Sequence, residues 1–150
     1  MLKTSMVPVA VVACLGIAAC GGGDKKLSKT DLAKKADAIC KDSASKSAKI
    51  TQPADLTANP QAAAEYFGKV LPVAENQTKK FEDLKPKDDV KAAWDQLVAR
   101  QKQGEDTLKT ILAKAKAKDR SGIVDLAKLG RIDKKFRAEA TAIGATGCAS

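Results

Sequence analysis

The sequence contains no histidine. Without imidazole, the Ser–His and Cys–His catalytic pairs and the metal sites built on histidine ligands are excluded. The Gly-rich loops that bind nucleotide phosphates are also missing. Neighbouring carboxylates such as Asp88 and Asp89 are more typical of a helix start than of acid–base catalysis. We therefore expect no catalytic residue, no metal site and no cofactor, and we expect that the protein is not an enzyme.

Aromatic residues are scarce, since the 150 residues include one Trp, one Tyr and three Phe. The core must therefore be built mainly from Leu, Ile, Val and Ala. Hydrophobic residues make up 44% of the chain and charged residues 30%, a balance too apolar for a disordered protein. No segment alternates polar and apolar residues as a half-buried strand does. These features predict a single all-α domain.

The chain has the periodicity of α-helices instead. Apolar residues recur at spacings of three and four over four ranges, 30–50, 60–85, 88–115 and 123–143. Thr30 or Asp31 is placed to cap the first helix, and Asn59 with Pro60 is placed to start the second. Gly144 is suited to end the fourth. Four amphipathic helices with short links favour an up-down-up-down four-helix bundle.

Some residues interrupt this pattern. The apolar seam of the third helix contains Gln101 and Gly104, which indicates either a close helix approach at the glycine or a partly hydrated middle layer. Tyr66 and Phe67 are adjacent and cannot both face inward, so one of them is expected at the surface. Pro72 should kink the second helix because it lacks an amide donor.

The N-terminus has the order of an export signal. Lys3 precedes an uncharged apolar run over 6–19, and small residues then lead to Cys20. The run is too short for a comfortable membrane span of about 20 residues, and no cluster of positive residues follows it directly. A permanent transmembrane helix is therefore not expected.

Residues 17–20, Ile-Ala-Ala-Cys, resemble the lipobox of bacterial lipoprotein signals. The resemblance implies that the sulfur of Cys20 carries a diacylglyceryl group, that residues 1–19 are removed as a signal peptide, and that the lipid holds the chain on the outer, extracytoplasmic face of the cell membrane. Cys14 ends a looser match, but cleavage there would leave an apolar stretch on the mature protein. An ordinary secretory signal with an incidental cysteine is the other interpretation.

The mature chain then divides into two parts. Residues 20–29 are expected to form a lipidated cysteine with a flexible tether, because Gly-rich segments behave as random coil, and residues 30–150 form the bundle domain. Two acyl chains on one cysteine suffice for stable anchoring. Lys25, Lys26 and Lys29 lie close to the anchor, so we expect them to contact the membrane surface.

Cys40 and Cys148 are the thiols that remain once Cys20 is lipidated and the signal is removed. An even pair in an exported chain predicts a disulfide. The bundle topology permits it, because the start of the first helix and the end of the fourth lie at the same end. Two cysteines without histidine are too few ligands for zinc, and the absence of a Cys-x-x-Cys pair argues against redox catalysis.

The whole layout looks like that of the small lipoproteins abundant in actinobacteria. It comprises the lipobox, a short tether, a first helix with the Asp37–Cys40 element, further helices and a closing Gly147–Cys148 pair. The resemblance implies location and a Cys–Cys staple. Those proteins are largely uncharacterised, so it implies neither an activity nor binding residues.

The balance of 27 basic and 18 acidic residues gives a formal charge of +9. Such an excess favours attraction to anionic lipid or polymer, although a solvated Lys-rich surface explains it as well. Nucleic acid is not expected outside the membrane. We predict a non-catalytic envelope protein that contacts membrane lipid through Cys20 and another protein or an anionic polymer through its helices. The alternative is a carrier of a small apolar ligand or lipid held between the helices; the oligomeric state stays open.

Overall fold

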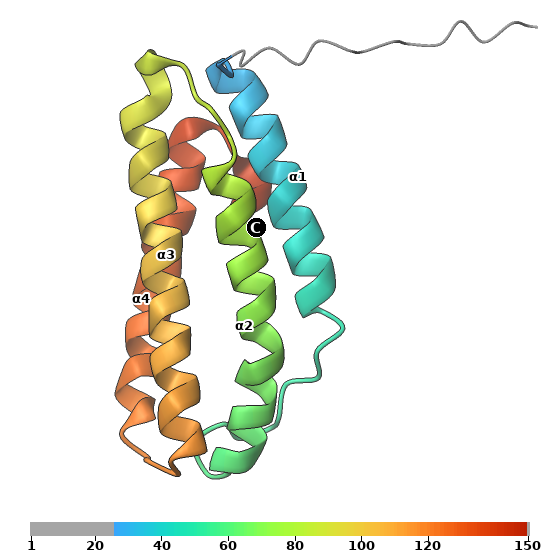
Figure 1. Ribbon diagram of the computed structural model, residues 1–150, viewed down its shortest axis with the longest axis vertical. Helices are drawn as coiled ribbons and strands as arrows, with labels where there is room; N and C mark the ends of the chain where they lie inside the picture. Colours follow the sequence, from blue (N-terminus) through green and yellow to red (C-terminus); the bar gives the residue numbers. More distant parts are fainter. Residues whose placement is uncertain (1–25, 150) are drawn as a thin grey trace, which may run out of the picture.

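The computed structural model describes residues 26–149, which form an all-α bundle (Figure 1). The helices run alternately up and down, and no strand occurs among these residues. The elements are α1 (Lys29–Ser47), α2 (Pro60–Glu82), α3 (Asp88–Lys116), α4 (Gly122–Ile143) and the short 3-10 helix η1 (Thr146–Cys148). The predicted fold class is therefore confirmed. The predicted signal, Cys20 and Lys25 lie outside the described residues.

The helix ends follow capping chemistry. Asn59 accepts a hydrogen bond from the amide of Ala62 at 3.1 Å, and Pro60 is the first residue of α2, both as predicted. The cap of α1 is Ser28, whose hydroxyl oxygen accepts from the amide of Asp31 at 3.2 Å. The prediction of Thr30 or Asp31 as this cap was wrong, because the serine before them satisfies the free amides first.

The chain before α1 is part of the fold. The amide of Leu27 donates to the carbonyl oxygen of Lys85 at 2.6 Å, and the amide of Lys87 donates to the carbonyl oxygen of Leu27 at 2.9 Å. Lys26 forms an ion pair with Asp88 at 2.6 Å. The folded part therefore begins earlier than the residue 30 boundary that the sequence predicts, and these contacts fix the start of α1 against the link between α2 and α3.

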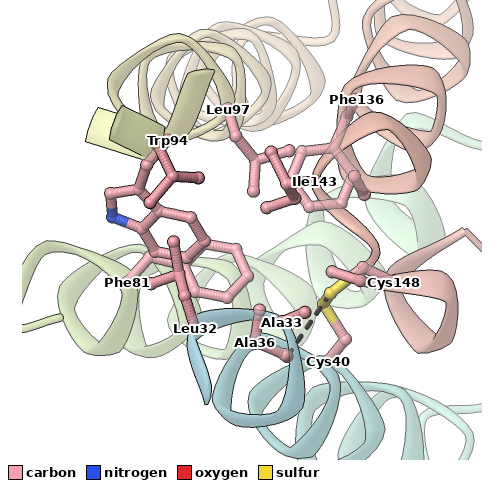
Figure 2. Close-up of a cluster of buried hydrophobic side chains, with 13 residues drawn as sticks. Leu32, Ala33, Ala36, Cys40, Phe81, Trp94, Leu97, Phe136, Ile143 and Cys148 are labelled. Carbon is pink, nitrogen blue, oxygen red and sulfur yellow. Dashed lines mark hydrogen bonds between the residues drawn. A yellow bond between two sulfur atoms is a disulfide. The ribbon is translucent and has the colours of Figure 1, made fainter. Parts of the chain in front are cut away.

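The upper half of the bundle has a core to which all four helices contribute. Trp94, Phe81, Leu32 and Leu97 are its largest fully buried side chains. Phe81 lies edge-on to Trp94, with ring centroids 5.3 Å apart, and Figure 2 shows Leu32 beside them. Phe136 of α4 stacks against Phe81 at 6.2 Å. This cluster is closely packed, and edge-to-face and offset aromatic contacts add to the stability that apolar burial supplies.

The lower half has a separate core. α1 ends at Ser47, three residues before the predicted end, and does not reach this part of the bundle (Figure 1). Phe67, Leu108 and Ile111 are buried there, and Leu56 from the link between α1 and α2 packs against them. Phe67 is buried and Tyr66 is half-buried against the same cluster, so neither ring is exposed and the expectation that one of them lies at the surface was wrong. α2 continues as one helix through Pro72.

The C-terminal segment returns to α1. Gly144 adopts a left-handed conformation, with φ of 88°, which ends α4 as predicted and turns the chain. Cys148 of η1 then forms the predicted disulfide with Cys40 of α1, across a sequence separation of 108. Beside it, the amide of Gly147 donates to Oδ1 of Asp37 at 2.8 Å. We call the disulfide and this hydrogen bond together the C-terminal clasp.

The close contact between Gly147 and Asp37 in the clasp leaves no room for a larger residue at position 147. A Cβ atom added there would lie 3.0 Å from Cγ of Asp37, closer than ordinary packing allows.

None of the helices described is long and apolar enough to cross a bilayer.

We predict that Cys40→Ser and Cys148→Ser lower the free energy of unfolding by similar amounts, and that the double variant is no less stable than either single variant. The loss should be at most about 4.7 kcal/mol, the chain-entropy value for a closed loop of about 100 residues. Urea unfolding of the three variants measures it. Additive losses, or free thiols at both positions in protein isolated from the envelope, would contradict the bond.

Candidate functional site

An open groove lies between α1 and α4, directly beneath the C-terminal clasp. η1 packs against both helices at this level. The groove has a volume of about 330 Å³, and all four helices line it. Its polar lining residues are Ser43, Ser47, Gln77, Arg100, Gln101, Asp133 and Arg137. Ligand sites in proteins have volumes of about 300 to 1,000 Å³, so this groove can hold a few side chains of a partner.

The floor of the groove carries two side-chain amides. Gln101 of α3 is half-buried and makes no hydrogen bond with the described part of the chain. Gln77 of α2 lies beside it and points Nε2 at the sulfur of Cys40, 3.5 Å away. An amide without a protein partner retains its full capacity to donate and accept. The groove therefore offers hydrogen bonds that the fold itself does not use.

The two interruptions of the α3 seam have different explanations. Gln101 is one of the residues that line the open groove. Gly104 lies where α3 meets α4, and a Cβ atom there would stand 3.7 Å from Cγ2 of Ile132, in ordinary contact. The open groove accounts for the polar residue Gln101, whereas the packing at Gly104 is no closer than ordinary contact.

The charged groups at the groove are compensated. Arg100 donates through Nη2 to Oε1 of Glu139 at 3.0 Å and through Nη1 to Gln103 at 2.7 Å. Arg137 donates through Nε to Oδ2 of Asp133 at 2.8 Å. Oε2 of Glu139 is buried and has no hydrogen-bond partner among residues 26–149. The two pairs leave little net charge, so the groove suits a neutral polar ligand better than an anionic one.

Asp42 positions the α1 wall of the groove. Its Oδ2 lies 2.8 Å from Nζ of Lys46 on α1 and 2.7 Å from Nζ of Lys80 on α2. Side-chain hydrogen bonds from Lys46 and Lys80 lower the pKa of Asp42 from 3.8 to about 2. The sequence analysis missed this bridge. The i,i+4 spacing of Asp42 and Lys46 is a signal for half of it, but the contact with α2 depends on how the helices pack.

The carrier alternative needs an apolar cavity between the helices. The pocket among the lower helix ends, lined by Phe67, Ile111 and Leu126, has a volume of about 30 Å³. That is room for about one water-sized probe and far below a typical ligand site. Other hollows, such as one of about 450 Å³ beside Trp94, are open and lie on the surface of the described residues. The structure thus offers no specific support for an apolar carrier within residues 26–149.

The other predicted site residues are placed as follows. Lys26 pairs with Asp88, and Lys29 is the exposed first residue of α1, so both lie at the end of the bundle where the N-terminal part of the chain joins it. Cys40 and Cys148 roof the groove. Within residues 26–149, no group of cysteine, aspartate and glutamate is arranged to hold a metal ion.

Comparison with known proteins returns no family model, no curated protein and no solved structure that matches this chain. The groove is therefore interpreted from its own geometry.

We predict that Asp42→Asn lowers stability at neutral pH and that the difference from the unaltered protein disappears in acid. The pKa of Asp42 is lower in the folded chain, so its stabilising effect is complete above about pH 4 and is lost as the pH falls towards 2. Urea unfolding at a series of pH values measures this. Asp106→Asn is the control, because Asp106 is exposed and makes no ion pair in the described part of the chain. A difference that persists at pH 2 would rule out the ion pairs as its cause.

Proposed function

We propose that this chain is a lipid-anchored protein of the extracytoplasmic face of the cell membrane, and that its helical domain binds an envelope protein in the groove between α1 and α4 without catalysing a reaction. The observation that carries the binding proposal is the half-buried amide of Gln101, which lies on the floor of an open groove and has no partner in the described part of the chain. The lipobox resemblance supports the anchor.

The chemistry of the groove favours a polypeptide as the partner. Gln77 and Gln101 on the floor and Ser43 and Ser47 on the wall donate and accept hydrogen bonds without charge. Peptide groups offer the matching donor and acceptor. Phe136 adds an apolar surface at the base, and such mixed lining is typical of recognition sites.

The groove is also rigid enough to bind without rearrangement. The C-terminal clasp fixes its upper edge, and the pairing of Asp42 with Lys80 fixes α1 on α2. A preformed site loses less conformational entropy when it binds, which raises affinity for a given set of contacts.

The proposed anchor lies close to one end of the bundle. Cys20 precedes Lys26 by six residues, and an extended chain spans at most about 3.6 Å per residue, so the acylated cysteine is within about 22 Å of that end. The groove opens on the side of the bundle and stays accessible from the aqueous phase in this arrangement.

Cys20→Ser should abolish incorporation of a fatty-acid analogue, because serine has no thiol to receive the lipid, while the helical domain keeps its circular dichroism spectrum and melting temperature. Metabolic labelling in the producing cells measures incorporation. Cys14→Ser is the matched control and should label normally. Continued labelling of the Cys20→Ser protein would move the anchor to another residue.

A photo-crosslinking side chain in place of Ser47, at the rim of the groove, should give one adduct of defined size in intact cells. The same side chain in place of Lys69, on the exposed face of α2, should not. Adding Gln101→Leu should reduce the Ser47 adduct, since it removes the floor amide without unfolding the bundle. Equal adducts from both positions, or an adduct unaffected by Gln101→Leu, would contradict binding in the groove.

A further inference from the structure

Part of the excess of basic residues lies on α4, and another part lies on α1 at Lys34, Lys35 and Lys41. Many lysines and arginines are neutralised by ion pairs, among them Lys26, Lys91 and Lys114. On α4, four basic side chains are exposed and make no ion pair with the described part of the chain. These residues, which we call the α4 basic stripe, are Lys128, Arg131, Lys134 and Lys135.

The carboxylates of α4 do not neutralise the stripe. Asp125 pairs with Lys114, Asp133 with Arg137 and Glu139 with Arg100. Asp106 of α3 and Lys128 line the same surface hollow, and Asp106 is the carboxylate residue in its lining. Because Asp106 makes no ion pair in the described part of the chain, it offsets one of the four positive charges, and the stripe and its surroundings keep a local charge close to +3.

The spacing of the stripe follows the helix axis. Successive residues of an α-helix are rotated by about 100°, so the four side chains fall within about a third of the circumference. Lys128, Arg131 and Lys135 are three and four residues apart, which corresponds to rises of about 4.5 and 6 Å along the axis. The charges therefore form a row with a repeat of about 5 Å.

The stripe lies far from the end of the bundle that carries Lys26. Asp88, the partner of Lys26, begins α3 and marks this end of the bundle. Arg100 follows Asp88 by twelve residues, or about 18 Å along α3, and its hydrogen bond to Glu139 places that residue of α4 at the same height. α4 runs antiparallel to α3, so the stripe begins about one turn farther along and extends over about another 10 Å. In a bundle standing on the anchored end, the stripe is several Debye lengths of about 8 Å from the headgroups.

We infer that the α4 basic stripe binds a linear polyanion, a phosphodiester polymer with one anionic group about every 5 to 6 Å, lying along α4. Such a polymer matches the stripe in charge and repeat, and each phosphate gains a charge-assisted hydrogen bond. That the protein meets the polymer outside the membrane rests on the proposed function; the binding itself does not.

The test uses the lipidated protein in detergent and a glycerol phosphate phosphodiester polymer as the probe. One variant changes the four stripe residues to Gln. The matched control changes Lys34, Lys35, Lys41 and Lys49 to Gln. These residues are exposed on α1 and just after it and make no ion pair within residues 26–149, so the control removes the same charge. Melting temperatures of both variants show that they are folded.

The stripe variant should bind the polymer at least about tenfold more weakly at low salt, and the dependence of log K on log salt should become shallower by about 3, as counterion release by four lost contacts requires. The α1 control should bind within about threefold of the unaltered protein, a change that uniform charge reduction explains. Equal weakening of both variants would show that net charge alone governs binding and would overturn the inference.

Two further measurements separate the sources of anionic charge. If the stripe variant keeps its polymer affinity but loses binding to phosphatidylglycerol vesicles, the stripe is a membrane contact and the inference is wrong. The Cys20→Ser protein should bind the polymer as the lipidated protein does, so a failure of the anchor proposal leaves this result unchanged.

Discussion

The C-terminal clasp is the constraint on which the rest of the arrangement depends. α1 is the shortest of the four helices, and most of its buried side chains are small, including Ala33, Ala36 and Ser43. Small side chains bury little apolar area, about 25 cal/mol for each Å², so packing alone holds α1 weakly. The disulfide between Cys40 and Cys148 adds a restraint that does not depend on area, because it acts on the unfolded chain. The bundle therefore closes through η1 rather than through broad contact between α1 and α4.

This mode of closure also leaves the groove open. A helix packed directly on another would cover Gln101, and burial of an unpaired amide costs about 1 to 3 kcal/mol. With η1 between α1 and α4 above it, Gln101 stays half-buried at the open groove, whereas the aromatic cluster around Trp94 is buried. The lower half avoids the same problem by a different route, because the link after α1 supplies Leu56 in place of a fourth helix. The bundle is therefore closed in both halves although Gln101 interrupts the apolar seam of α3.

The sequence predicted what depends on local periodicity and missed what depends on placement. The four helices, the cap at Asn59 and the disulfide follow from spacing, capping residues and cysteine number. The pairing of Leu27 with the segment between α2 and α3 is carried by main-chain groups, which have no sequence signature, so the fold begins before the predicted boundary. The groove depends on the position of η1 against α1, which local sequence patterns do not specify. The hydrogen bond from Gly147 to Asp37 that helps to fix this position joins residues 110 positions apart. Only the polar interruption at Gln101 pointed to the groove in advance.

The electrostatics of α4 show why the total charge of the chain says little about any one surface. On its groove side, Arg137 is neutralised by Asp133, and Arg100 reaches across from α3 to Glu139. On its outer side, the lysines and arginine of the basic stripe have no such partners among the residues that the structure describes. A single helix thus separates a neutral polar groove from a row of positive charge. Salt screens charges that lie more than about 8 Å apart, so a ligand responds mainly to the charges next to it. The two surfaces therefore select ligands of different chemistry although they belong to one basic domain.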